Sequence, residues 1–324
     1  MSVLIYSENT EGKFKKSTFE AVSYASKIAD QLGTELVAVS LGKVDADSLK
    51  SLSKYGVSKV LNADSDLYSS FNNQNYAHAV AEAAKSIDAK VVVISNSSNG
   101  KGIAPRVAVK LKAGLATGAI ELPKTDGDFV VRVKAFSNKA FADVKIKSEI
   151  KLITINANAF QAAENAKETT VETVDFGADP NASKQNVKET IRKTDKVLLP
   201  EAELVVSAGR GLKGPENWGM VEELADLLGA ATACSKPVSD SGWRPHSEHV
   251  GQTGIAVSPN LYIAIGISGA IQHLAGVSSS KTIVVINKDP EAPFFKAADY
   301  GVVGDAFEVV PKLIEAVKAY KGEG

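Results

Sequence analysis

Short apolar runs alternate with longer amphipathic stretches in the first third of the chain. The apolar runs predict β-strands that begin at Val3, Glu35, Val57 and Lys90. The stretches between them predict helices over residues 17–32, 47–55 and 76–87, the first with Ser17 as its N-cap and Gly33 just past its end. This alternation is typical of a parallel sheet covered by helices on both faces.

The pattern changes after Gly114. Residues 129–136, FVVRVKAF, and residues 140–155 alternate apolar and charged positions, which predicts an antiparallel hairpin with one face in water. Residues 156–196 are polar and contain few large apolar side chains, so we interpret them as an arm and linker.

A second α/β pattern begins at Leu204. Its apolar runs predict strands that begin at Leu204, Ala230, Leu261, Lys281 and Tyr300. Helices are predicted over residues 216–228, with Gly229 as the stop signal, and over residues 307–320. The expected fold class is therefore α/β, with two domains at residues 1–195 and 196–324, each a mainly parallel sheet with flanking helices.

Composition narrows the functional classes. A length of 324 residues suits two domains, and a net charge of -1 gives no sign of nucleic acid or an anionic membrane surface as partner. Cys234 is the single cysteine, so it cannot form a disulfide within the chain, and we interpret it as a small buried residue rather than a redox thiol. One cysteine and four scattered histidines do not match a zinc site. The sequence shows neither a secretory signal nor a run long enough to cross a bilayer, so we expect a cytoplasmic protein without membrane insertion.

Small, polar or charged residues follow the predicted strands of the second half. These strand ends carry Gly209-Arg210-Gly211, Ser235-Lys236, Ile267-Ser268-Gly269, Asn287 and Asp305. In open α/β sheets ligands bind outside the carboxyl ends of the strands, so a binding crevice is expected there. The alternative is the ordinary polarity of loops.

Residues 209–214, GRGLKG, match the dinucleotide-binding fingerprint by letter. Glycines let a backbone approach a pyrophosphate, and Arg210 offers bidentate phosphate recognition unless it is simply an exposed loop cation. The following strand ends in Ser-Lys instead of the acidic residue that holds an NAD ribose. An NAD(P)-dependent oxidoreductase therefore stays open as an alternative, as does a nucleotide-binding module built on the first domain. Residues 95–102, SNSSNGKG, lack the spacing of a P-loop and predict a polar loop.

Two further stretches of the second half could bind a ligand. Ser268, Gly269 and Ala270 can present backbone N–H groups at the start of a helix, and His273 follows about one turn later. Residues 250–254, VGQTG, place a hydroxyl and an amide between two glycines. A structural histidine and a plain turn are the respective alternatives.

Five motifs of the second half together resemble the α subunit of electron-transfer flavoprotein: SAGRGLKGPENW, ACSKPVSDSGW, VGQTG, LYIAIGISGAIQHLAG and TIVVINKDPEAPFFKAADYGVVGD. The VGQTG form is similar to that of the housekeeping branch, which serves fatty-acid and amino-acid oxidation. The resemblance implies an N-terminal nucleotide-α-hydrolase-like domain and a C-terminal FAD-binding domain. It also implies a heterodimer with an electron-transfer flavoprotein β subunit, and an electron carrier rather than an enzyme. Such a carrier takes electrons from acyl-CoA dehydrogenases and related enzymes and passes them to a quinone oxidoreductase.

The resemblance also assigns residues to the FAD site. Arg210, Ser235 and Ser268 should approach the phosphates, and Lys236 should lie over the flavin ring. The hydroxyl of Thr253 should lie near the central-ring nitrogen. The whole set comprises Arg210, Ser235, Lys236, Val250, Gly251, Gln252, Thr253, Gly254, Ser268, Gly269, Ala270, Ile271, Gln272, His273, Asn287 and Asp305.

The remaining assignments concern the two ends of the cofactor. The resemblance places Gln272 and His273 at the pyrimidine end of the flavin ring, where partial positive charge from His273 and from the helix start would stabilise a reduced ring. Asn287 should bind the linker or ribose, and Asp305 the adenine side. Lys236 stands where the family members that this chain resembles carry arginine. A lysine keeps the charge but not the planar fork, so we expect a shifted redox potential.

Overall fold

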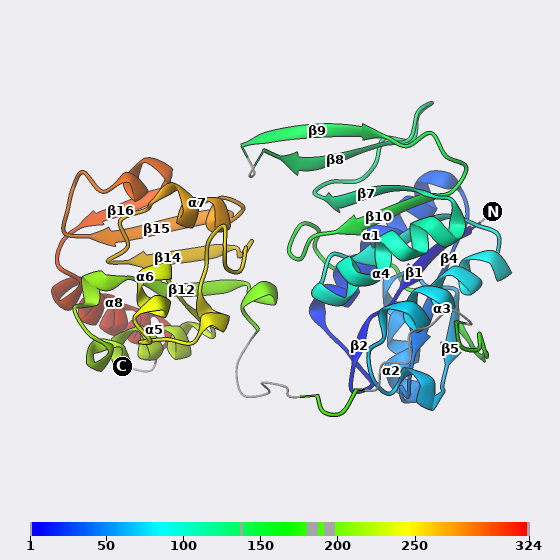
Figure 1. Cartoon of the computed structure of the whole chain (residues 1–324), viewed down its shortest axis with the longest axis horizontal. Coiled ribbons are helices and arrows are strands. Elements are labelled where there is room, and N and C mark those ends of the chain that lie inside the picture. Colours follow the sequence, from blue (N-terminus) through cyan, green and yellow to red (C-terminus); the bar gives the residue numbers. More distant parts are fainter. Residues whose placement is uncertain (1, 137–138, 180–186, 191–197, 323–324) are drawn as a thin grey trace. The chain divides into compact units, whose positions relative to one another are not determined.

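The computed structural model describes residues 2–136, 139–179, 187–190 and 198–322. The chain divides into two compact units, Met1–Ile191 and Arg192–Gly324 (Figure 1). The domain boundary expected between residues 195 and 196 lies outside the described residues. Each unit is described by itself.

The first unit contains a nine-stranded sheet with the order β11-β5-β4-β1-β6-β10-β7-β8-β9. Its strands are β1 (Ser2–Tyr6), β4 (Glu35–Leu41), β5 (Lys59–Ala63), β6 (Ala89–Ser95), β7 (Gly114–Ala119), β8 (Val130–Ala135), β9 (Ala140–Lys145), β10 (Lys151–Ile155) and β11 (Thr170–Thr173). Neighbouring strands are parallel from β11 to β7, and antiparallel from β7 through β8 to β9. A separate two-stranded ribbon joins β2 (Asn9–Thr10) to β3 (Lys13–Phe14).

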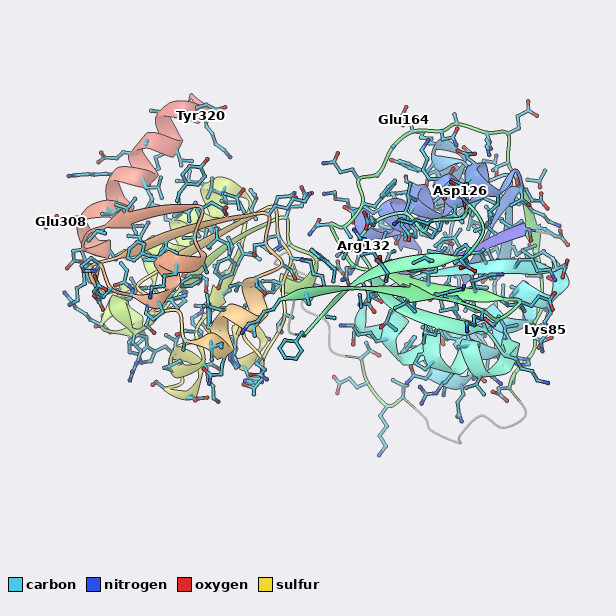
Figure 2. All side chains as sticks on the ribbon, turned by 90° about the horizontal axis from the view of Figure 1, so that it is seen from above. Lys85, Asp126, Arg132, Glu164, Glu308 and Tyr320 are labelled. Carbon is cyan, nitrogen blue, oxygen red and sulfur yellow. The ribbon has the colours of Figure 1, made fainter. Side chains whose placement is uncertain are left out.

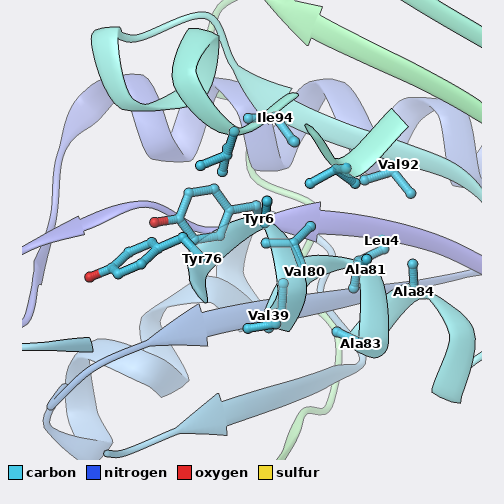
Figure 3. Close-up of a cluster of buried hydrophobic side chains, with 14 of the residues drawn as sticks. Leu4, Tyr6, Val39, Tyr76, Val80, Ala81, Ala83, Ala84, Val92 and Ile94 are labelled. Atoms are coloured by element: carbon cyan, nitrogen blue, oxygen red, sulfur yellow. The ribbon is translucent and has the colours of Figure 1, made fainter. Parts of the chain in front are cut away.

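Helices cover both faces of this sheet, as the strand and helix alternation predicts. They are α1 (Lys16–Leu32), α2 (Ala46–Ser51), α3 (Asn73–Ser86) and α4 (Ser98–Leu111), with 3₁₀ helices η1 (Leu52–Tyr55) and η2 (Asp66–Tyr68). Side chains alternate along a strand, so Val3 and Ile5 of β1 pack with α1 and α2 while Leu4 and Tyr6 pack with α3 and α4. Figure 3 shows the second cluster, where Tyr6 and Tyr76 meet edge to face.

Three local predictions for the first unit are wrong. Helix α1 begins at Lys16, and Lys15 is its N-cap, so Ser17 is inside the helix; Gly33 does end it, in the left-handed conformation. Helix α3 begins at Asn73, earlier than predicted, because the Asn72 side chain accepts hydrogen bonds from the first turn. Residues 95–102 are not all loop, because Ser97 caps helix α4 through the Gly100 N–H.

The segment after Gly114 also differs from its prediction. The hairpin exists as β8 and β9, and its surface carries charged side chains such as Arg132 (Figure 2). Residues 151–155 do not extend this hairpin but form β10, which lies between β6 and β7 in parallel pairing. Residues 152–155 are all buried, as in a strand that is covered on both faces.

Residues 156–179 of the expected arm fold back onto the first unit. Strand β11 pairs with β5 at the edge of the sheet. The Ala163 N–H donates to Ser23 Oγ at 3.1 Å, and Asn165 Nδ2 donates to Ser26 Oγ at 3.0 Å. Residues 180–186 and 191–196 of the expected arm lie outside the described residues.

The second unit contains a five-stranded parallel sheet with the order β13-β12-β14-β15-β16. Its strands are β12 (Leu204–Ala208), β13 (Ala231–Cys234), β14 (Leu261–Ile265), β15 (Thr282–Asn287) and β16 (Tyr300–Val303). Its helices are α5 (Gly219–Leu228), α6 (Lys236–Asp240), α7 (Ile271–Val277) and α8 (Ala306–Lys321). Its 3₁₀ helices are η3 (Leu199–Glu201), η4 (Arg210–Leu212), η5 (Pro215–Asn217), η6 (His246–Glu248) and η7 (Pro293–Ala297).

The two faces of this second sheet are covered differently. Helices α5, α6 and α8 pack on one face, and α7 packs on the other together with the loop around Val250 and with Phe294. This arrangement places α7 and the VGQTG loop on the same side of the sheet. Within the described part of the chain, no helix combines the length and the apolar character that crossing a membrane requires.

Candidate functional site

Backbone hydrogen bonds connect the loops at the carboxyl edge of the second sheet. The Gly209 N–H donates to the Ile265 carbonyl at 2.9 Å, and the Gly211 N–H donates to the Gly266 carbonyl at 3.1 Å. The Gly266 N–H in turn reaches the Ile286 carbonyl at 2.8 Å. The loops after β12 and β14 therefore lie side by side, and the second of them is bonded to the end of β15. A binding crevice at this edge stays a prediction.

The glycines of GRGLKG serve packing inside this surface. A Cβ on Gly209 would lie 2.4 Å from the Gly266 oxygen, and one on Gly211 would lie 2.6 Å from the Gly266 Cα. The 3₁₀ helices η4 and η5 then intervene before α5 begins at Gly219. The dinucleotide fingerprint requires a strand that leads through one tight turn into a helix, and GRGLKG does not have this context. Arg210 is exposed at the start of η4.

The VGQTG loop is held between β13 and α7. The Val250 N–H donates to the Cys234 carbonyl at 3.0 Å, and the Gln252 N–H donates to the Gln272 carbonyl at 2.7 Å. The side chains of Gln252 and Thr253 are exposed, whereas Gly251 is buried. The structure thus brings Gln252 and Thr253 next to the helix that carries Gln272 and His273.

His273 is buried and uncharged. The residue is only 6% exposed, and its Nε2 atom forms a 3.0 Å hydrogen bond with the Tyr262 hydroxyl. Within the described residues Nδ1 has no hydrogen-bond partner. Burial, and next the neighbouring His249, lower the pKa of His273 to about 4. At neutral pH the imidazole is therefore uncharged, and the partial positive charge that the family resemblance implies for His273 would come from a ring N–H.

Lys236 is a second cation at this edge, besides Arg210. It opens the short helix α6, it is exposed, and its Nζ lies 3.1 Å from Asp240 Oδ2. Ser235 precedes it as the N-cap and is buried, and its N–H donates to the Ala208 carbonyl at 3.1 Å. The charge of Lys236 is thus available at the site but shared with Asp240.

Asn287 and Asp305 already make local hydrogen bonds. Asn287 Nδ2 donates to the Ile267 carbonyl at 2.9 Å, which holds the loop after β14. Asp305 caps α8, because its Oδ1 accepts the Phe307 N–H at 3.0 Å. The Gly304 N–H donates to the Asn287 carbonyl at 3.0 Å and places both residues at the same edge. Their contacts with a cofactor stay predictions.

The edge fits a ligand that combines phosphates with an apolar ring. Among the described residues, the N–H groups of Ser268, Gly269 and Ala270 have no hydrogen-bond partner. Ile271 beside them is a large apolar side chain that is 59% exposed. Unpaired donors are costly unless water or a ligand satisfies them, so this donor set is suited to an anionic group.

Three residues of this region escaped the sequence-based prediction. His249 lies directly before the VGQTG loop, and that position could have drawn attention to it. Tyr262 bonds His273, and the Phe294 ring lies 5.7 Å from the His273 ring. Both aromatic residues sit inside apolar runs, so a sequence pattern does not distinguish them from ordinary core residues.

Comparisons with known proteins identify the family of the chain. The family model "Electron transfer flavoprotein domain" matches residues 3–179, and "Electron transfer flavoprotein FAD-binding domain" matches residues 198–278. The protein "Electron transfer flavoprotein subunit alpha" of Syntrophomonas wolfei subsp. wolfei is 40% identical over 97% of this chain and 98% of its own length. The protein of the same name from Bacillus subtilis is 37% identical over 98% and 97%. "Protein FixB" of Clostridium saccharobutylicum is 33% identical over 98% and 96%.

The fold and the strand-end site define a two-unit α/β flavoprotein. The chain belongs to the electron transfer flavoprotein family, among its α subunits. Its second unit is the FAD-binding domain, and its cofactor is FAD. Membership in the α-subunit group implies a β subunit as partner and a role in electron transfer.

Proposed function

We propose that this chain pairs with an electron-transfer flavoprotein β subunit and carries electrons from acyl-CoA dehydrogenases and related enzymes to a quinone oxidoreductase. The process it serves would be fatty-acid β-oxidation, and its compartment the cytoplasm. Two observations support this proposal: the VGQTG loop lies beside α7, and several relatives named as α subunits match nearly the whole chain. The chain would act as a carrier whose cofactor cycles without a substrate of its own.

The unpaired donors at the strand ends carry the assignment of the FAD site. Ser268, Gly269 and Ala270 offer backbone N–H groups, and Arg210 and Ser235 are the side chains nearest in sequence to the neighbouring strand ends. We assign these residues to the phosphates of FAD, because N–H groups and a guanidinium satisfy phosphate oxygens. Asn287 and Asp305 are assigned to the ribose and adenine portion.

The flavin ring is assigned to the face formed by the VGQTG loop and α7. FAD supplies the redox chemistry when it is bound, and the protein supplies binding, orientation and electrostatics. The Tyr262 hydroxyl fixes the orientation of His273 through Nε2. The remaining residues of this face are Lys236, Val250, Gly251, Gln252, Thr253, Gly254, Ile271 and Gln272.

A reconstituted complex tests the proposal. We would express the chain with its β subunit, record the visible spectrum, and quantify FAD released on denaturation. We expect a yellow complex that an acyl-CoA dehydrogenase reduces in the presence of its substrate and that a quinone oxidoreductase reoxidises. A colourless complex that binds NADPH would support the oxidoreductase alternative instead. A flavin-containing complex that acyl-CoA dehydrogenases fail to reduce would retain the carrier and reject the pathway.

A pair of arginine variants tests the phosphate assignment. Arg210→Met removes an exposed cation at the strand ends, and Arg106→Met removes an exposed cation from helix α4 of the first unit. We expect Arg210→Met to weaken FAD binding roughly tenfold or more, since one charge-assisted contact contributes about 1.5–3 kcal/mol. Arg106→Met should leave the affinity unchanged. Equal affinities for both variants would contradict the assignment of Arg210.

A further inference from the structure

His249 lies at the base of the VGQTG loop and is almost completely buried, with 2% of its surface exposed. Its backbone joins β13 through a bridge to Cys234. Its carbonyl accepts the Ile255 N–H at 2.8 Å, so the chain returns to His249 immediately after the loop. His249 therefore lies where the chain enters the loop and is bonded to the residue at which the chain leaves it.

The loop is wound tightly around the His249 ring. A Cβ on Gly254 would lie 2.7 Å from Nδ1 and 2.8 Å from Cγ of this ring. A Cβ on Gly251 would lie 3.5 Å from Nε2 and 3.0 Å from the Gln272 carbonyl. The two glycines of VGQTG thus allow the backbone to fold onto an imidazole on one side and onto α7 on the other. Gln252 and Thr253, between these glycines, are held outward and exposed.

We propose that His249 is a positioning residue for the flavin site, whose buried imidazole supports the Val250–Gly254 loop and so fixes Gln252 and Thr253. This inference rests on the proposed function, because it assigns a consequence to the same FAD site. The imidazole fills the space that the loop encloses, and without it the loop would lose the surface on which it is folded. FAD would then have to order the loop on binding, which reduces affinity.

The support works only while the imidazole is neutral. Within the described residues Nδ1 has no hydrogen-bond partner, so a proton there would be a buried charge without compensation. The ring of His246 on η6 lies 5.3 Å from the His249 ring, and Lys236 on α6 also disfavours the charged form.

The other elements packed against His249 do not supply enough negative charge to stabilise a protonated imidazole. Asp240 on α6 favours the charged form of His249, but its effect is smaller than those of burial, His246 and Lys236. His273 on α7 is itself uncharged, and burial raises the pKa of the Cys234 thiol on β13 to about 12. Burial, the largest effect, lowers the pKa of His249. Acid should therefore release the loop and weaken FAD binding.

Three variants of the complex with the β subunit test this role, after FAD has been removed and titrated back. His249→Ala removes the support and should weaken FAD binding roughly 10- to 100-fold at pH 7.5, the effect expected when two more side chains must be ordered on binding. His249→Phe keeps a ring but cannot be protonated, so it should bind FAD within about threefold of the wild type at pH 7.5. It should also lose less affinity than the wild type between pH 7.5 and 5. His246→Ala, at the adjacent exposed histidine, is the matched control for affinity and should bind FAD like the wild type at pH 7.5. Because it removes a group that disfavours the charged form of His249, it should lose affinity at a higher pH than the wild type.

Amide hydrogen exchange of the FAD-free complex provides a readout that does not depend on the cofactor. The N–H groups of Gly251 and Gln252 should exchange faster in His249→Ala than in the wild type, with His249→Phe close to the wild type. Unchanged exchange in His249→Ala, or an equal loss of FAD affinity in His246→Ala, would overturn the proposal. If His249→Ala fails to fold, His249→Phe provides the test. An acid-induced loss of FAD affinity as large as that of the wild type, or faster exchange in the loop, would overturn the proposal. A wild-type complex that binds no FAD would reject the proposed function, and the exchange data would still judge the role of His249 in the loop.

Discussion

At the scale of single residues, His273 links the stability of the second unit to pH. The unfolded chain binds a proton near pH 6.5, whereas burial lowers the pKa of the folded imidazole to about 4. Between these values the unfolded state binds more protons, so the free energy of unfolding rises with pH. The stabilisation is complete above pH 6.5 and is lost as the pH falls to 4, with a total of about 3 kcal/mol.

Urea unfolding of the wild type and His273→Gln at pH 7 and pH 4.5 measures this linkage. Acidification should destabilise the wild type by about 2 kcal/mol more than the variant, because glutamine takes up no proton. The variant His78→Gln, which removes a histidine from helix α3 of the first unit, serves as the control. Parallel losses in the wild type and His273→Gln would show that His273 is not the linked group.

Lys236 is a second residue whose contribution is electrostatic. Its ion pair with Asp240 is solvent-exposed on both sides, so Lys236→Met should hardly change the melting temperature. The same change removes the cation assigned to the flavin face. We expect the flavin midpoint potential to become more negative in Lys236→Met and to change less in Lys236→Arg, as measured by spectroelectrochemical titration. A potential identical in all three proteins would remove Lys236 from the flavin face.

At the scale of elements, Arg244 connects the chain before the VGQTG loop to helix α5. Its Nε and Nη2 each lie 2.8 Å from Glu248 on η6, and its Nη1 lies 3.0 Å from Glu222 on α5. The guanidinium also stacks over Trp218 at 5.4 Å. The Arg244 and Glu248 side chains are only 17% and 13% exposed, so their charges are weakly screened.

Arg244→Met should therefore lower the free energy of unfolding of the second unit by about 2 kcal/mol, since it leaves the carboxylate of Glu248 without its partner. Arg132→Met is the matched control. Arg132 forms the same bidentate pair with Asp143 across the β8–β9 hairpin, but these side chains are 38% and 45% exposed, so little stability should be lost. Chemical unfolding measures the free energy of unfolding of both variants. Equal decreases would show that burial does not strengthen the ion pair of Arg244.

The strands and helices of this chain can be predicted from its sequence only in part. Apolar runs locate the buried strands of both sheets, because burial selects for apolar residues wherever the strand lies. They do not reveal which strands pair, so the sequence pattern of residues 151–155 predicts a hairpin strand although β10 pairs with β6 and β7. Ser17 is not the cap of α1, because the helix begins after Lys15, whose side chain makes no capping hydrogen bond, and no residue type in the sequence therefore marks this start.

The candidate site, too, could be predicted from the sequence only in part. Strand-end loops could be predicted because parallel strands bring their carboxyl ends to one edge of the sheet. The charge of His273 could not, because it depends on burial beside Tyr262 and His249, which are distant or inconspicuous in sequence. The role of the GRGLKG glycines was equally hidden, since Gly266 belongs to another loop.

At the scale of the whole molecule, the two units have separate cores. Each of the four hydrophobic clusters formed by described residues lies wholly within one unit. A ligand stabilises only the cooperative unit that must be folded to bind it. FAD should therefore protect the second unit and leave the unfolding equilibrium of the first unit unchanged.

Native-state hydrogen exchange on the complex with the β subunit tests this independence. At an FAD concentration 100 times Kd, the slowest amides of β12 and β14 should gain about 2.7 kcal/mol of protection relative to the FAD-free complex. The slowest amides of β1 and β6 in the first unit should gain none. Arg210→Met at the same FAD concentration should reduce the gain in β12 and β14, because it weakens binding without entering either core. Equal gains in both units would mean that they unfold together, and the separation of their hydrophobic clusters would then not set the cooperativity of the chain.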